Sequence, residues 1–412
     1  MYRSRCVVAG AAAGLVTFAV PAAGAADHQH LTCGQTITAS TKLRHDLTGC
    51  GATGLVIGAD HVTLDLNGHA IRGTNAAGSV GVAVDGHRGV TIRRGTVSDF
   101  FDAGVAFHAA PHGAVHRLRI VRIGAGGLEP QASTGIRIDT SPGTRVTASV
   151  VANDVKAFQS DGVDVLSSPG VAIRGNRLSH NAWNGLVVLF SSHTRVAGNV
   201  LDANGNNGLE ANGASDGVVV RGNLARKNVQ FGLVVGSLKH ARVTGNRVSG
   251  NAAAGVFLFD LISSLVGGNR AERNGVGIQL EGGQFGSHGN ALLHNRANRN
   301  GDVGILVEGG ADDNRIVGNE ASANRGTDGG GIVVAVAHGN LVRRNVANGN
   351  VASGIRVIED TPGDATGNRL ARNRTDRNGG HGIDAVAGTV DGGGNIARGN
   401  ATPPACVGVT CH

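Results

Sequence analysis

Five residues whose side chains could act in catalysis, Asp85, His108, Arg137, Asp139 and Asp164, follow one another in the first half of the sequence. Each occupies a polar position of a recurring motif, in which a glycine is followed by alternating apolar and polar residues. Because alternate side chains of an extended strand point to the same face, these residues are expected to project outward from successive strands. A base beside an arginine is the combination needed to remove the proton next to a sugar carboxylate. The cluster therefore predicts proton-transfer chemistry on an acidic sugar.

The residue types suggest individual roles within this cluster. We expect Arg137 to bind a carboxylate through two hydrogen bonds, and we expect His108 and Asp164 to take part in moving the proton. Asp85, Asp139 and Asp164 together supply the oxygen ligands that calcium prefers. In an alternative interpretation, charges on successive strands of an exposed face pair as ordinary surface ions.

Two further polar residues, Glu210 and Asn212, occupy the same kind of position later in the chain. Because they would project from the same outer face, they are predicted to bind the substrate together with Asp85 and Asp139.

A metal site of a different kind is predicted near the start of the chain. Residues 7–20 are apolar or small and follow two arginines, and Ala23-Gly24-Ala25 suits a signal peptidase, so residues 1–25 are predicted to be a cleaved secretory signal. Cleavage after Ala25 would expose Ala26-Asp27-His28, whose amine, amides and imidazole can bind copper in a square plane. Copper binding at His28 is therefore a further hypothesis.

A sequence repeat predicts the strands that carry these residues. A glycine followed by an apolar, a variable and a second apolar residue recurs at Gly54, Gly81, Gly104, Gly135, Gly162, Gly185, Gly208, Gly232, Gly255, Gly277, Gly304, Gly331, Gly354 and Gly382. The central intervals are 22–24 residues long and hold short alternating segments, with no stretch long enough for a helix. The sequence predicts an all-β fold, a single-stranded right-handed parallel β-helix of about 14 coils.

Asparagines recur in pairs five residues apart, from Asn176 and Asn181 to Asn395 and Asn400. A repeated polar side chain could line a binding groove. Stacking explains the spacing better, because identical amides on successive coils can hydrogen-bond into ladders within turns. The asparagines are therefore predicted to be structural and are left out of the candidate site.

Four cysteines follow the predicted signal segment, Cys33 and Cys50 near one end and Cys406 and Cys411 near the other. Export favours disulfides. In a rod-shaped solenoid the two ends lie beyond the reach of one disulfide, so only Cys33–Cys50 and Cys406–Cys411 are expected to pair.

Charge and composition narrow the choice of partner. The chain has 37 Lys plus Arg against 30 Asp plus Glu, a formal net charge of +7 that is spread along the sequence. This suits attraction to acidic polymers but is not the dense basic stripe of a nucleic-acid binder. No segment after the leader is long enough to span a membrane. The scarcity of aromatic residues, 3% of the chain, disfavours neutral glycans, so an extracellular acidic polysaccharide is the predicted partner.

An apolar stripe interrupts the outer face in the middle of the chain. Outward positions hold Val187, Leu189, Val234, Phe257 and Phe259, with Phe190 and Leu261 beside them. Such a stripe is either covered by another segment of the chain or contacts a partner, and we favour a covering segment.

The segment Val62-Thr63-Leu64-Asp65-Leu66-Asn67-Gly68-His69-Ala70-Ile71-Arg72-Gly73 resembles the first coil of the pectate-lyase-like right-handed β-helix superfamily, and the later Gly-Asn turns resemble NosD-type repeats. The resemblance covers about residues 54–400 and implies the fold more than an activity, because the superfamily includes pectate lyases, polysaccharide hydrolases, uronan epimerases, adhesins and copper-processing proteins. The sequence lacks the Asp-Pro-His-Asp motif of alginate epimerases and the paired-Asp and Gly-His-Gly motifs of polygalacturonases. No catalytic residue is carried over by motif.

These observations predict four parts: a signal peptide at 1–25, an N-terminal cap with a disulfide at 26–53, the β-helix at 54–395 and a C-terminal cap with a disulfide at 396–412. The protein is predicted to be secreted and to engage extracellular acidic polysaccharide, as a lyase or an epimerase. The alternatives are a non-catalytic extracellular or cell-surface scaffold or adhesion protein, and a copper-handling protein.

Overall fold

Short strands and tight turns make up the described part of the chain. The computed structural model describes residues 30–124, 133–152 and 160–412. The chain divides into two compact units, Met1–Leu31 and Thr32–His412, and all of the strands lie in the second unit. The predicted signal segment 1–25 and the predicted copper ligand His28 lie outside the described residues. No helix in the described ranges is long and apolar enough to cross a membrane.

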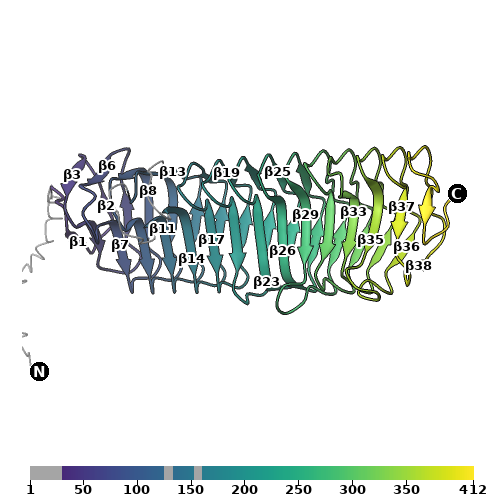
Figure 1. Ribbon diagram of the computed structural model, residues 1–412. Coiled ribbons are helices and arrows are strands. Elements are labelled where there is room, and N and C mark those ends of the chain that lie inside the picture. Colours follow the sequence, from purple (N-terminus) through teal and green to yellow (C-terminus); the bar gives the residue numbers. More distant parts are fainter. Residues whose placement is uncertain (1–29, 125–132, 153–159) are drawn as a thin grey trace, which may run out of the picture. The chain divides into compact units, whose positions relative to one another are not determined.

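One parallel sheet of 16 strands runs the length of the second unit (Figure 1). Its strands, in order, are β1 (Gln35–Ile37), β4 (Thr53–Ile57), β7 (Val80–Asp85), β9 (Ala103–His108), β11 (Ser133–Asp139), β14 (Ser160–Leu166), β17 (Leu186–Leu189), β20 (Leu209–Asn212), β23 (Leu233–Lys239), β26 (Ala254–Ile262), β29 (Val276–Glu281), β31 (Ile305–Glu308), β33 (Gly330–Ala335), β35 (Ser353–Ile358), β37 (Ile383–Ala385) and β39 (Cys406–Val407). Each turn of the chain contributes one strand, which confirms the predicted all-β parallel β-helix. The 14 predicted coils correspond to β4 through β37, and the two end segments add β1 and β39.

The remaining strands stack in the same way on the other sides of each turn. A second stack is formed by β2 (Thr41–Lys42), β5 (Thr63–Asp65), β8 (Thr91–Ser98), β10 (Ala114–Val121), β12 (Arg145–Thr147), β15 (Ala172–Arg174), β18 (Arg195–Ala197), β21 (Val219–Arg221), β24 (Arg242–Thr244), β27 (Leu265–Gly267), β30 (Ala291–Leu293), β32 (Arg315–Val317), β34 (Leu341–Arg343), β36 (Arg369–Ala371) and β38 (Val390–Asp391). A third includes β3 (Leu47–Cys50), β6 (Ala70–Gly73), β13 (Val150–Ala152), β16 (Arg177–Leu178), β19 (Val200–Asp202), β22 (Leu224–Arg226), β25 (Arg247–Ser249) and β28 (Arg270–Glu272), together with the second halves of β8 and β10.

Alternation along each strand buries one set of aliphatic side chains. Ile136 and Ile138 of β11 are fully buried, and so are Val163 and its equivalents in later turns. The repeat glycine lies where two turns approach closely, since a Cβ built at Gly162 would lie 2.4 Å from the backbone oxygen of Gly185. The recurring Gly-apolar-x-apolar motif is therefore explained by close stacking of the backbone and a dry core.

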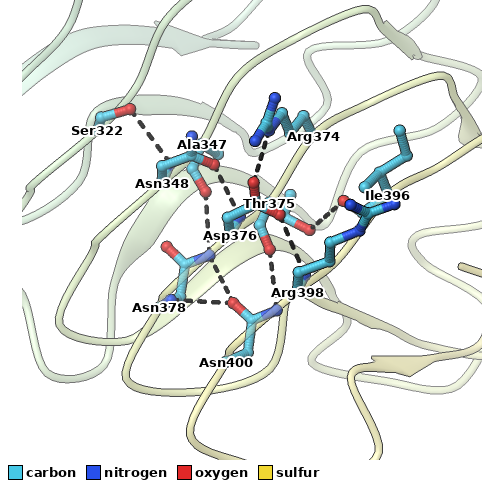
Figure 2. A network of polar contacts seen from close by, with 10 residues as sticks. All are labelled: Ser322, Ala347, Asn348, Arg374, Thr375, Asp376, Asn378, Ile396, Arg398 and Asn400. Carbon is cyan, nitrogen blue, oxygen red and sulfur yellow. Dashed lines mark hydrogen bonds and ion pairs between the residues drawn. The ribbon is translucent and has the colours of Figure 1, made fainter. Parts of the chain in front are cut away.

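The paired asparagines form two buried ladders, as predicted. In the first ladder the Nδ2 of Asn199 donates to the Oδ1 of Asn223 at 3.0 Å, and the Nδ2 of Asn223 donates to the Oδ1 of Asn246 at 3.1 Å. In the second ladder, Figure 2 shows Asn378 donating through Nδ2 to the Oδ1 of Asn400, a distance of 3.0 Å. Each side-chain amide hydrogen-bonds to the asparagine of the next turn and to the backbone. The asparagines are therefore part of the scaffold.

Disulfides lie in both end segments. Cys33 is bonded to Cys50, and Cys406 is bonded to Cys411, which confirms the predicted pairing. Disulfides form in oxidising compartments, so these bonds indicate a location outside the cytoplasm.

Candidate functional site

The predicted site residues project from the 16-stranded sheet in two neighbouring columns. The first column pairs Arg137 of β11 with Asp164 of β14, and continues through Val187 of β17 to Glu210 of β20. Adjacent strands lie about 4.8 Å apart, so Glu210 lies two strand spacings from Asp164. Arg137 and Asp164 are thus brought together by the strand register.

The second column carries the other predicted residues. Asp85 of β7 pairs in register with His108 of β9, and His108 pairs with Asp139 of β11. The Nδ1 of His108 lies 3.0 Å from the Oδ2 of Asp139, with 61% of the histidine side chain exposed. Asn212 lies further along, three strands beyond Asp139. His108 and Asp139 are in hydrogen-bonding contact with each other, in a column separate from that of Arg137 and Asp164.

Asp161 is the residue that sequence analysis missed. It lies at the start of β14, is only 9% exposed, and shares a hydrogen bond with Asp164. Its Oδ1 accepts a hydrogen bond from the backbone N–H of Asn184 at 2.7 Å. The sequence did carry a signal, because Asp161 directly precedes the repeat glycine, as Asn184 and Asn207 do in the next two turns.

Asp164 completes a carboxyl pair that is poorly neutralised. Its Oδ2 accepts a hydrogen bond from the Oγ1 of Thr134 at 2.5 Å. Its Oδ1 is buried and has no hydrogen-bond partner among the described residues. A buried acceptor without a partner is costly to the folded state.

Burial raises the pKa of both members of the pair. For Asp161, burial is the main cause and the charge of Asp164 adds to it, against the hydrogen bond from the Asn184 backbone. Burial also raises the pKa of Asp164, against the hydrogen bond from Thr134 and the charge of Arg137. Two carboxyl groups in contact titrate as a unit, so the pair retains a proton to higher pH than an ordinary carboxyl.

Glu210 forms the far edge of the site. Burial raises the pKa of this carboxyl, opposed by a hydrogen bond from Asn207. The Asn207 Nδ2 donates to the Glu210 Oε2 at 3.5 Å. Burial and a neutral hydrogen-bond partner make Glu210 a polar group able to contact a ligand from the same face as Asp164.

The predicted apolar stripe overlaps the site, because Val187 lies between Asp164 and Glu210 in the first column, and it continues beyond Glu210 to Val234 and Phe257. The rings of Phe231 and Phe257 stack with centroids 4.9 Å apart, and those of Phe257 and Phe259 lie 5.5 Å apart. Phe190 has 60% of its surface exposed, whereas Leu261 is fully buried in the core. The aromatic rings thus cover part of one another. A covering segment or a partner for the stripe stays a prediction.

The donor atoms of the described residues do not fit a copper site. Residues 30–124, 133–152 and 160–412 contain no group of three or more His, Cys, Asp or Glu side chains able to hold a metal ion. The four cysteines in these ranges are in disulfides and offer no thiolate. Asp85, Asp139 and Asp164, the predicted calcium ligands, are divided between the two columns.

Two stretches of the chain match a known protein family. Residues 122–286 and 285–392 match the family model described as periplasmic copper-binding protein (NosD). No curated protein matches the sequence.

Solved structures with a similar backbone are β-helical proteins of low sequence identity. The periplasmic alginate epimerase AlgG is 14% identical over 86% of this chain and 77% of its own, with a TM-score of 0.45. The Azotobacter vinelandii mannuronan C-5 epimerase AlgE6 A-module is 14% identical over 88% of this chain and 91% of its own, with a TM-score of 0.46. The Dettilon tailspike protein is 17% identical over 80% of this chain and 64% of its own, with a TM-score of 0.48. At such identities the likeness concerns the fold alone.

Proposed function

This chain belongs to the NosD family, and within that family we propose that it is a secreted, carbohydrate-active enzyme that removes a proton from a uronate residue of an acidic polysaccharide, as a lyase or an epimerase. The observation that supports this most is the Asp161–Asp164 pair beside Arg137, with a buried oxygen of Asp164 left without a partner among the described residues.

Each group has a distinct task in this proposal. Arg137 binds the carboxylate of the sugar and neutralises the charge that builds up as the neighbouring carbon loses its proton. Asp164 accepts that C5 proton, for which a raised pKa makes it a stronger base. Asp161 is a positioning residue, which orients Asp164 and shares its proton.

In a lyase the bonding changes balance as follows. The electron pair of the C5–H bond forms a double bond between C4 and C5, and the bond between C4 and the glycosidic oxygen breaks. The carboxyl pair, which now carries two protons, returns one to that oxygen. In an epimerase no glycosidic bond breaks. A water molecule donates a proton to C5 on the opposite face of the ring, and the carboxyl pair releases the proton that it took to the hydroxide left behind.

The test follows the ultraviolet absorbance of the unsaturated uronide, with pectin, alginate and glycosaminoglycans as substrates, in the presence and absence of calcium. An epimerase is detected by incorporation of solvent deuterium at C5. We expect Arg137→Ala to lower kcat/KM by roughly 10²–10³-fold, as removal of a single charge-stabilising group does in other enzymes, and Asp164→Asn to lower it at least as much. Asp376→Asn is the matched control, because it makes the same substitution on a distant turn.

His108→Ala separates two assignments of the base. Retained activity supports Asp164, whereas a loss as large as that of Asp164→Asn supports the assignment of His108 predicted from the sequence. If no substrate shows elimination or exchange, the enzyme proposal is wrong and the non-catalytic scaffold or adhesion protein takes its place.

Copper binding is the second candidate, because the family description names it. The donor set for it is the predicted Ala26-Asp27-His28 terminus, which lies outside the described residues. We expect the mature protein to bind one Cu(II) with a visible absorbance band that His28→Ala abolishes. An unchanged band in this variant would contradict the assignment.

A further inference from the structure

The second stack of strands carries an arginine on each of five consecutive turns. We define the arginine zigzag as Arg145 of β12, Arg174 of β15, Arg195 of β18, Arg221 of β21 and Arg242 of β24, all exposed. At about 4.8 Å between strands the zigzag is about 19 Å long and runs along the axis of the stack. It lies on a different sheet from the Asp161–Asp164 pair.

The strand register keeps these charges from lying directly opposite one another. Arg145 pairs with Ala172, which pairs with Arg195, and in the other column Arg174 pairs with Ala197, which pairs with Arg221. Like charges directly opposite each other on a sheet are destabilising. Alternation between the two columns therefore gives every turn one guanidinium at the smallest electrostatic cost.

No countercharge accompanies the zigzag within the described residues. Its five strands contain no acidic residue, and none of the five arginines has an ion pair or a side-chain hydrogen bond in the described part of the chain. The third stack is mixed in this respect. Arg226 pairs with Asp202 and Arg270 with Glu272, whereas the exposed Arg177 and Arg247 have no ion pair among the described residues. An ordinary solvated face carries both positive and negative side chains. The zigzag differs from such a face because its charges are all positive.

The same alternation begins again on the third strand after the zigzag ends. Arg315 of β32, Arg343 of β34 and Arg369 of β36 occupy alternate columns. There the positive charges of neighbouring arginines, Arg344 first among them, lower the pKa of Arg343. Positive charge on this stack is thus concentrated in both runs, and no ion pair among residues 30–124, 133–152 and 160–412 neutralises it.

We propose that the arginine zigzag binds a linear acidic polysaccharide lying along the axis of the stack. Guanidinium groups match carboxylate and sulfate oxygens with two hydrogen bonds each. The residues between them are Ala, Val and Thr, so the face has neither the aromatic rings on which single-stranded nucleic acids stack nor the large apolar anchors of a membrane-binding surface. The substrate class rests on the proposed function, but the residues are distinct from the catalytic ones.

The test is the salt dependence of binding of the full mature protein to polygalacturonate and to alginate. We expect Arg174→Gln, Arg195→Gln and Arg221→Gln, combined in one variant, to raise Kd by roughly tenfold or more at low salt and to flatten the dependence of log Kd on log salt, because fewer counterions are released. The matched control replaces Arg273, Arg299 and Arg325, which line a pocket of about 430 Å³ in another part of the surface and also have no ion pair among the described residues. This control removes the same charge and is expected to change Kd by less than about threefold.

Three outcomes would overturn the proposal. Equal losses in both triple variants mean that overall charge, not this face, attracts the polymer. Tighter binding of single-stranded DNA, or of anionic lipid vesicles, than of the polyuronates identifies another class of ligand. No binding to polyuronates at low salt removes the site altogether. Arg137→Ala keeps the two proposals apart, because it should lower kcat/KM by roughly 10²–10³-fold and leave binding at the zigzag intact.

Discussion

Two aspartates occupy equivalent places in columns of side chains that accept hydrogen bonds from the backbone of the next turn, yet their surroundings differ. In Figure 2, Asp376 accepts through Oδ2 from the Nε of Arg374 at 2.5 Å, so its charge is neutralised within its own turn. Asp161 is equally buried, but its hydrogen-bonded neighbour is the carboxyl group of Asp164. The first arrangement stabilises the fold, whereas the second places two acidic groups in contact.

This difference separates scaffold from site in a molecule made of repeats. A polar residue that recurs on each turn and is satisfied by its neighbours has a structural explanation. A charged residue that replaces an amide and raises the electrostatic free energy of the folded state has no such structural explanation. Electrostatic costs of this kind are typical of catalytic centres. The comparison thus favours Asp161 and Asp164 over the more regular polar positions.

The largest expected effect comes from placing an unpaired aspartate in the amide ladder. Asn223 donates through Nδ2 to the backbone oxygen of Val196 at 3.0 Å and to the Oδ1 of Asn246. In Asn223→Asp an oxygen faces both acceptors, so we expect a loss of roughly 3–5 kcal/mol in the free energy of unfolding at neutral pH. Denaturant unfolding should recover part of this loss as the pH falls and the buried carboxyl becomes protonated. A loss that does not depend on pH would mean that charge is not the cause.

Asp161→Asn should increase the free energy of unfolding, whereas Asn223→Asp should decrease it. The pKa of Asp161 is raised in the folded protein, so its protonated form is favoured by folding and the native state loses stability as the pH rises above about 4. We expect the variant to be more stable than the original by roughly 1–3 kcal/mol at neutral pH, with little difference at acidic pH. Thermal unfolding between about pH 4 and about pH 8 measures this, and a destabilised variant at the higher pH would refute the description of the carboxyl pair. Activity should fall in the same variant, since Asp161 orients Asp164.

Asp376→Asn should change the free energy of unfolding least of the three substitutions. Arg374 is largely exposed, so the ion pair is screened by solvent and its loss should cost less than about 1 kcal/mol. The backbone hydrogen bond that Asp376 accepts can be kept by the new amide oxygen. Thermal unfolding should show little dependence of this difference on pH above about 5. A gain in stability similar to that of Asp161→Asn would remove the contrast between the two regions.

Much of the fold could be predicted because its causes are local and repeated. The glycine period, the alternation around Ile136 and Ile138 and the paired asparagines each impose the same geometry on every turn. The disulfides followed from the separation of the two ends. The candidate site was harder, because Asp161 lies next to a repeat glycine, where the adjacent turns carry structural amides, and only its contact with Asp164 distinguishes it.

The sequence by itself determined the parallel β-helix, its two disulfides and the structural place of the asparagines, because close backbone approach and a dry core tolerate few alternatives at each repeat. Only the tertiary structure decided which outward residues meet. Arg137 lies beside Asp164 while His108 lies beside Asp139, although all four occupy similar positions in their repeats. Strand register and the burial of each side chain are set by contacts between turns, and those contacts depend on groups that are distant in the sequence.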